Sequence, residues 1–198
     1  MISLEEAKKL MTKSSKEKLK KLVDLNLPKI NFSNKINNDI VMQALCRAVE
    51  DDVIHISDLD DKLVKLLNSN TNTISIGKLN RALSVIRKTN PNIICYISLK
   101  DPESHLTMNE WFIDGTDEYV FHRMFEYVLT EFKITPHIIR NKMTETLKPT
   151  VVNNVAQLVA KYSVASKEER NKMVISIRTI TRLVNMSGYL IYAEFKKI

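Results

Sequence analysis

A chain of 198 residues, 44% of them hydrophobic, is long enough to bury a core in one domain or in two small ones. Its three glycines are too scattered for a P-loop or a dinucleotide-binding motif, and they argue against an all-β fold, which needs many tight turns. The net charge of +7 favours association with nucleic acid or another anionic surface, and it excludes no fold.

The first 30 residues predict a basic helical arm. Ser3 and Glu6 have the spacing of a capping box, Ser14 interrupts the helix, and Pro28 ends it. Residues 1–30 carry eight Lys and Arg against four acids. Half of these cations form one run, made of Lys16, Lys18, Lys20 and Lys21. The run is either a solvated helix face or a basic arm that contacts phosphates.

The segment from Asn38 to Gly115 predicts an unusual order of elements. Apolar periodicity and turn residues indicate helix Asn38–Glu50, a short strand Val53–Ile56, helices Asp58–Leu67 and Ile76–Lys88, a strand Ile93–Leu99, a polar loop Lys100–Thr107 and a strand Trp111–Ile113. Asn37 or Asn38 can cap the first helix, and Ser75 can cap the third. Residues 31–116 carry nine Lys and Arg against eleven acids, so this segment is slightly acidic within a basic chain.

The predicted helix 76–88 separates into an apolar half and a polar half. At ~100° per residue, its aliphatic side chains gather on one side and are expected to face a core. The opposite side carries Gly77, Lys78, Asn80, Arg81, Ser84, Arg87 and Lys88. Arg bonds guanine and Asn bonds adenine bidentately, while Lys and Ser contact phosphates or bases. An ordinary solvated or partner-facing helix has the same pattern, so both interpretations stay open.

This order of elements resembles the winged helix-turn-helix superfamily over residues 38–115. The resemblance implies a domain over residues 31–116, a third helix that enters the DNA major groove, and a wing formed by the loop Lys100–His105. The predicted wing departs from many DNA-binding members, because it has two acids against one lysine. Winged helices also serve as protein-docking modules, so the resemblance alone does not select the partner.

Residues 117–198 predict a C-terminal helical domain with thirteen Lys and Arg against eight acids. The predicted helices are Asp117–Phe132 capped by Thr116, one from Thr135-Pro136 to Pro149, Val151–Tyr162, and a long one from the capping box Ser166–Glu169 to about Met186. Gly188 stops the last helix, and Tyr189–Phe195 is either a strand or a further helix.

Arg178 and Arg182 share one face of the predicted last helix with Asn185. They are expected to add phosphate contacts to a DNA-binding surface. Two alternatives remain: a second, truncated helix-turn-helix, and arginines that snorkel over the rim of a helical bundle.

The sequence offers no support for catalysis. Four histidines are scattered over different elements, and the two cysteines have no metal-ligand spacing. Glu194-Phe195-Lys196 has the Glu-x-Lys form of one class of metal-dependent nucleases, but no upstream acid on a strand accompanies it. We therefore expect no enzyme, no cofactor and no metal site. No segment is long and apolar enough to predict a membrane span, and no secretory signal is apparent.

Together these patterns predict a mainly α protein with a winged-helix-like middle segment, a small β-hairpin, an N-terminal helical arm and a C-terminal helical bundle. The expected function is a non-enzymatic DNA-binding protein, either a transcription regulator or a replication accessory factor. Its expected duplex-DNA contacts are Lys78, Asn80, Arg81, Ser84, Arg87, Lys88, Arg178 and Arg182. The alternative is an assembly adaptor, viral in one version, that uses the same fold without touching DNA. Either protein would be intracellular, in a bacterial cytoplasm or in a host cell.

Overall fold

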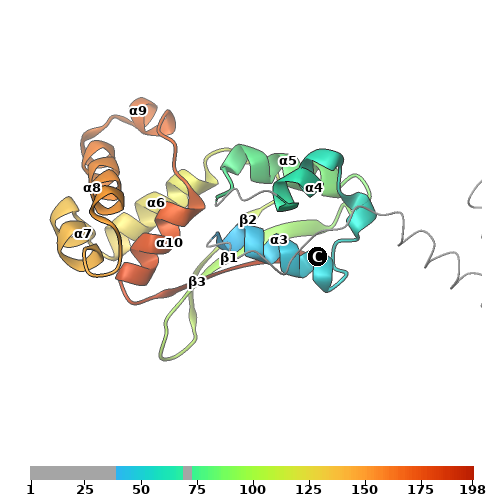
Figure 1. Ribbon diagram of the computed structural model, residues 1–198, viewed down its shortest axis with the longest axis horizontal. Helices are drawn as coiled ribbons and strands as arrows, with labels where there is room; N and C mark the ends of the chain where they lie inside the picture. Colours follow the sequence, from blue (N-terminus) through green and yellow to red (C-terminus); the bar gives the residue numbers. More distant parts are fainter. Residues whose placement is uncertain (1–38, 69–72) are drawn as a thin grey trace, which may run out of the picture. The chain divides into compact units, whose positions relative to one another are not determined.

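The computed structural model of the protein describes residues 39–68 and 73–198 (Figure 1). All of them belong to one unit, Phe32–Ile198. The predicted basic arm over residues 1–30 and the predicted caps Asn37 and Asn38 lie outside the described residues. The described chain is mainly α-helical, with one small antiparallel sheet.

The first part of the described chain contains three α-helices, with a short 3₁₀ helix between the first two, followed by a hairpin. Asp39 caps the first helix, because its Oδ1 accepts hydrogen bonds from the backbone N–H groups of Val41 and Met42. Ser75 caps the third helix, as predicted. The elements are α3 (Ile40–Glu50), the short 3₁₀ helix η1 (Ile56–Asp58), α4 (Asp61–Asn68), α5 (Ile76–Ile86), β1 (Ile93–Lys100) and β2 (Thr107–Ile113).

The predicted strand Val53–Ile56 is wrong. These residues form a turn that leads into η1, and the backbone N–H of Ile54 donates to the carbonyl of Ala48 at 2.9 Å. His55 and Asp58 form a capping box around η1, so local side-chain bonds satisfy the backbone groups that a strand would have paired. Four apolar-rich residues are too short a run to outweigh these local bonds.

The second part of the described chain contains five helices and a final strand. Pro149, expected to end a helix, instead occupies the first turn of one, where its missing N–H costs nothing. The elements are α6 (Val120–Glu131), α7 (Pro136–Met143), α8 (Pro149–Val164), α9 (Lys167–Asn171), α10 (Ile177–Met186) and β3 (Leu190–Lys197). The undecided segment at the C-terminal end is therefore a strand.

The single long helix predicted from Ser166 to Met186 is also wrong, because residues 172–176 are not helical and separate α9 from α10. The predicted capping box at Ser166 and Glu169 is present and starts α9. After α9, His122 of α6 lies within hydrogen-bond distance of the Met173 carbonyl, with its Nε2 3.0 Å away. Ser176 then caps α10 through the backbone N–H of Thr179. Two helices, each capped by a serine, thus take the place of one continuous helix, and the bond between His122 and Met173 holds the segment between them.

The three strands form an antiparallel sheet in the order β2-β1-β3. β3 comes from the predicted C-terminal domain but pairs with β1 along its whole length, from Ile93↔Lys197 to Lys100↔Leu190. The predicted segments 31–116 and 117–198 therefore share one sheet. Helix α3 lies against β3, and Arg47 donates a hydrogen bond from its guanidinium to the Ala193 carbonyl at 3.3 Å.

The two faces of the sheet differ in character. Side chains alternate along each strand, so one face is buried and the other is partly open to solvent. We call the buried one the inner face, and it carries Cys95, Ile97, Leu99, Ile113, Ile191, Ala193 and Phe195. Among residues 39–68 and 73–198, no helix combines the length and the apolar content that crossing a bilayer would require.

Candidate nucleic-acid-binding surface

Helix α5 is held in place by its apolar side. Leu79, Ala82, Leu83 and Ile86 are each 0% exposed, so the orientation of the helix about its own axis is fixed by the core. The opposite side is exposed, and we call it the outer face of α5. Of the six residues of this region that were predicted to contact DNA, it carries Lys78, Arg81 and Ser84. The helix ends at Ile86 and not at Lys88 as predicted, so Lys88 is exposed in the turn that follows α5.

The side chains of the other two predicted contacts, Asn80 and Arg87, are engaged in hydrogen bonds to backbone carbonyls. Asn80 is buried and donates from Nδ2 to the carbonyl of Asp117 at 3.0 Å. Arg87 donates to the Asp114 carbonyl at 2.7 Å and, through Nε, to the Pro91 carbonyl at 2.8 Å. The two residues are seven positions apart, which is about two helical turns, so they lie along one line on the helix. Together they bind the loop between β2 and α6 to α5.

Gly115 explains why this loop can approach α5 so closely. Its φ is +98°, a conformation that residues with a Cβ rarely adopt. A Cβ built at this position would lie 3.1 Å from the Leu83 Cβ and 3.2 Å from the Asn80 carbonyl oxygen. The helix and the loop therefore form one packed junction, with Asn80 and Arg87 serving as its hydrogen-bond donors.

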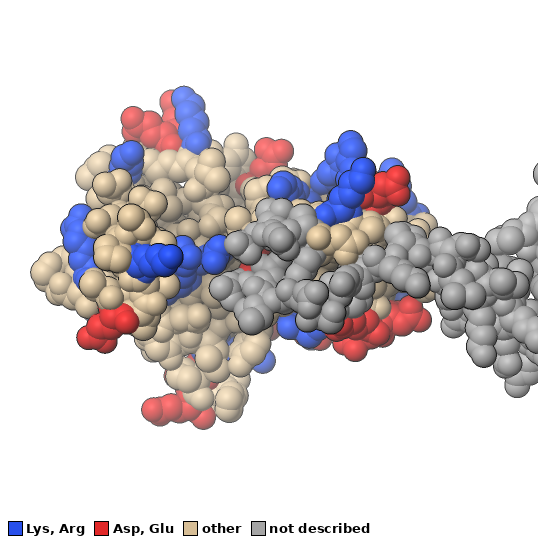
Figure 2. All heavy atoms as spheres, in the orientation of Figure 1, with Lys and Arg blue, Asp and Glu red and all other residues tan. Residues whose placement is uncertain are grey.

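The outer face of α5 is cationic and only weakly paired. Arg81 forms an exposed ion pair with Asp60 at 3.3 Å. Burial acts to raise the pKa of the Asp60 carboxyl, but the hydrogen bonds from the Leu63 N–H and from Arg81 outweigh it and hold that pKa below its usual value. The ammonium groups of Lys78 and Lys88 make no ion pair within residues 39–68 and 73–198. Figure 2 shows Lys and Arg side chains over α4 and α5, with acids beside them.

Helix α10 presents a second pair of cations, Arg178 and Arg182, one helical turn apart. Both side chains are half-buried, and neither forms an ion pair with any carboxylate in the part of the chain that the structure describes. Burial lowers the pKa of the Arg182 guanidinium, and the charge of Arg178 lowers it further. The attraction of an external anion such as a phosphate would offset both effects.

The tip of the β1–β2 hairpin is a poor phosphate contact. Asp101 accepts from the backbone N–H groups of Glu103 and Ser104 at 3.0 and 2.7 Å, which fixes an acidic turn at the tip. The hydrogen bonds from Ser104 hold the pKa of the Asp101 carboxyl below its usual value. Leu106, beside this turn, is 70% exposed. Any role of the hairpin therefore depends on contacts other than charge.

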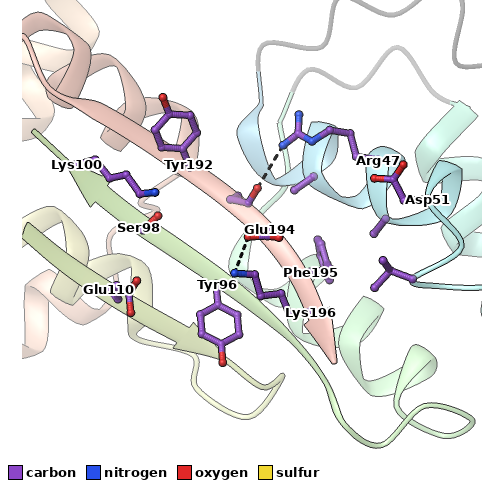
Figure 3. A pocket seen from close by; sticks show the side chains of 14 residues that line it. Arg47, Asp51, Tyr96, Ser98, Lys100, Glu110, Tyr192, Glu194, Phe195 and Lys196 are labelled. Atoms are coloured by element: carbon purple, nitrogen blue, oxygen red, sulfur yellow. Dashed lines mark hydrogen bonds and ion pairs between the residues drawn. The ribbon is translucent and has the colours of Figure 1, made fainter. Parts of the chain in front are cut away.

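A groove of about 500 Å³ lies between α3 and the open face of the sheet (Figure 3). We call that open face the outer sheet face. It carries Tyr96, Ser98 and Lys100 of β1, Glu110 and Phe112 of β2, and Tyr192, Glu194 and Lys196 of β3. Sequence reasoning missed this groove, because β3 is far from β1 along the chain. The one signal that could have helped is the alternation of apolar and polar positions in the last residues, where Ala193 and Phe195 alternate with Glu194 and Lys196.

Two further observations limit the chemistry of these surfaces. Within the described ranges, no group of three or more His, Cys, Asp or Glu side chains is placed to hold a metal ion. Cys95 is fully buried, and burial raises the pKa of its thiol.

Comparisons of the chain with protein-family models, with characterised proteins and with solved structures find no match.

Proposed function

We propose that this protein is a non-enzymatic DNA-binding protein that holds duplex DNA on the outer face of α5. The observation that carries the proposal is the separation of side chains on this helix. Its core side is occupied, and so is the line of Asn80 and Arg87, which we call its loop-binding edge. By contrast, Lys78, Arg81 and Ser84 remain exposed on the helix, and Lys88 is exposed in the turn that follows it. An α-helix of this kind fits the major groove, where Arg reads guanine and Lys contacts phosphates.

The ion pair between Arg81 and Asp60 does not oppose this role. The Arg81 side chain is 49% exposed and the Asp60 side chain 35%, and exposed pairs of this kind contribute little to stability. Arg81 can therefore exchange the carboxylate for a phosphate or a guanine edge at small cost. Asp60, left unpaired by this exchange, would repel phosphates on the α4 side of Arg81. This repulsion favours docking with a defined register.

Arg178 and Arg182 add a second, sequence-independent contact. Two half-buried guanidiniums without a carboxylate partner in the described chain would gain from a phosphate between them. This contribution would increase affinity for any duplex and would not select a target site. A role in transcription or in replication is compatible with this chemistry.

A duplex-binding titration at two salt concentrations tests the proposal. Neutralised phosphates release counterions, with a slope of about −0.9 in log K against log salt for each. Contacts by Lys78, Arg81 and Lys88 alone thus predict that affinity falls roughly 40-fold between about 50 and 200 mM salt. The double variant Lys78→Glu, Lys88→Glu should lose most of the binding, because it replaces attraction to the backbone with repulsion.

The matched control is Lys142→Glu with Lys161→Glu, which makes the same change of charge at exposed positions of α7 and α8. This variant should retain most of the affinity if α5 holds the DNA. Equal losses in the two variants would reduce the effect to net charge. Absence of duplex binding at low salt, together with co-purification of one stoichiometric protein, would instead favour the assembly adaptor.

A further inference from the structure

We propose that the outer sheet face binds single-stranded nucleic acid by stacking bases on Tyr96, Phe112 and Tyr192. This surface differs from the outer face of α5 and does not depend on its role. The three rings come from three adjacent strands, and antiparallel pairing brings them onto one face. Phe112 is 57% exposed and Tyr192 47%, so large apolar area faces solvent where no described segment covers it.

The rings are arranged as a platform rather than as isolated side chains. Tyr96 and Phe112 lie directly opposite each other on β1 and β2, with ring centroids 4.7 Å apart in an edge-to-face arrangement. Tyr192 lies opposite Ser98, and is therefore on the diagonal from Tyr96. Diagonal neighbours of a sheet are roughly 7–8 Å apart, a distance that successive bases of an unpaired strand can span. Aromatic rings on a sheet hold unpaired bases in this way because every base has a π-face.

A lysine accompanies each of the two tyrosines. The Lys100 Nζ lies 5.5 Å from the centroid of the Tyr192 ring, and the Lys196 Nζ lies 5.4 Å from the centroid of the Tyr96 ring (Figure 3). Both lysines belong to the strand next to that of their tyrosine. A base that stacks on the ring can displace the flexible ammonium group, which then reaches the phosphate beside that base. Each ring and its lysine together match one nucleotide.

The charge of this face sets how the binding should behave. Glu194 is paired with Lys196 at 2.9 Å, and Glu110 lies on the same face. These two acids balance Lys100 and Lys196, so stacking must supply most of the affinity and ion release only a little. Two phosphate contacts to an unpaired strand predict a slope of about −1.4 in log K against log salt. The adjacent groove, of about 500 Å³, has room for a base beside the tyrosines.

Fluorescence anisotropy of a labelled oligothymidylate, which does not form duplexes with itself, tests this proposal with the full chain. The wild-type protein should bind at micromolar concentrations with the shallow salt dependence given above. Tyr192→Ala and Phe112→Ala should each weaken binding roughly 5- to 150-fold, the effect of losing one stacked base. Tyr192→Phe should preserve it, since the ring remains. An oligouridylate of the same length shows whether DNA or RNA is preferred.

The control is Tyr119→Ala, since Tyr119 is 46% exposed but is the N-cap residue of α6 and belongs to none of the three strands. It should leave oligothymidylate binding unchanged, and thermal unfolding checks that each variant is folded. Wild-type affinity in Tyr192→Ala, or no binding by the wild-type protein, overturns the proposal. If Phe112→Ala instead converts a dimer to a monomer in sedimentation, the face joins two copies and the proposal fails. Lys78→Glu with Lys88→Glu should not affect this assay, so its result is independent of duplex binding.

Discussion

Arg87 and Lys88 are neighbours at the C-terminal end of α5, yet their side chains meet different surroundings. Arg87 donates to two backbone carbonyls, at Pro91 and Asp114, and so holds the chain on both sides of the β1–β2 hairpin. Lys88 is exposed, and its ammonium makes no ion pair with any described residue. Two cations of similar length thus serve folding in one case and are available for binding in the other.

This difference follows from helix geometry and from the loop that packs beside it. The loop between β2 and α6 approaches α5 along the line of Asn80 and Arg87, and Gly115 makes that approach possible. Arg81 and Lys88, which directly follow Asn80 and Arg87 in the sequence, are exposed to solvent. The type of a side chain therefore does not decide its role on α5, whereas its position relative to the loop does.

The largest expected effect comes from substitution of Gly115. Gly115→Ala should lower the free energy of unfolding by about 2–4 kcal/mol, because the new Cβ meets Leu83 and the Asn80 carbonyl and the φ of +98° is strained for alanine. Urea denaturation measures the change. Gly188→Ala is the matched control, since its φ is +83° but no atom lies within 4 Å of the added Cβ. It should cost only about 1 kcal/mol. Equal costs would show that the loop does not pack tightly on α5.

A smaller effect separates the two neighbours directly. Arg87→Met removes both hydrogen bonds while keeping most of the aliphatic stem, and should lower the free energy of unfolding by about 1–2 kcal/mol. Lys88→Met should change stability by less than about 0.5 kcal/mol. In duplex titrations the order reverses: Lys88→Met reduces the salt slope by about 0.9, and Arg87→Met leaves it unchanged. If both variants reduce the slope, Arg87 releases its carbonyls to contact DNA, and the proposed division of roles is wrong.

Local patterns in the sequence predicted the elements, and long-range packing decided the site. Ser75 and the apolar period of α5 predicted the helix, its cap and its exposed cations, because all three depend on neighbours within a few residues. The inward placement of Asn80 could not be predicted in the same way. Its partner is the Asp117 carbonyl, 37 residues away, and only the folded loop brings the two together.

The same distinction explains the errors in the predicted elements. Val53–Ile56 has the composition of a strand, but the position beside β1 is taken by β3 from the C-terminal end of the chain. Residues 166–186 have the composition of one helix, but the contact of His122 with the Met173 carbonyl favours a break. The outer sheet face could be predicted only in part. The expected hairpin holds Tyr96 and Phe112, but the pairing of β3, which adds Tyr192 from the C-terminal end, depends on long-range packing.

The smallest expected effect concerns the second cationic pair, which extends the comparison from α5 to α10. Arg178 and Arg182 lie one turn apart and repel each other, whereas Arg81 of α5 has Asp60 as a partner. Arg182→Gln should therefore raise the free energy of unfolding slightly, by about 0.2–0.5 kcal/mol, because like charges at this spacing destabilise a helix by that amount. The same variant should bind duplex DNA more weakly. Parallel urea and DNA titrations measure both changes.

Arg178→Gln is the natural companion variant, because it relieves the same repulsion from the other side. Both variants should show the same pair of changes, a small gain in stability and a loss of affinity. A loss of stability greater than about 1 kcal/mol in either variant would mean that the arginine stem packs over the rim of the helices and supports the fold. In that case α10 would resemble the loop-binding edge of α5, and the outer face of α5 would be left as the proposed duplex-binding surface.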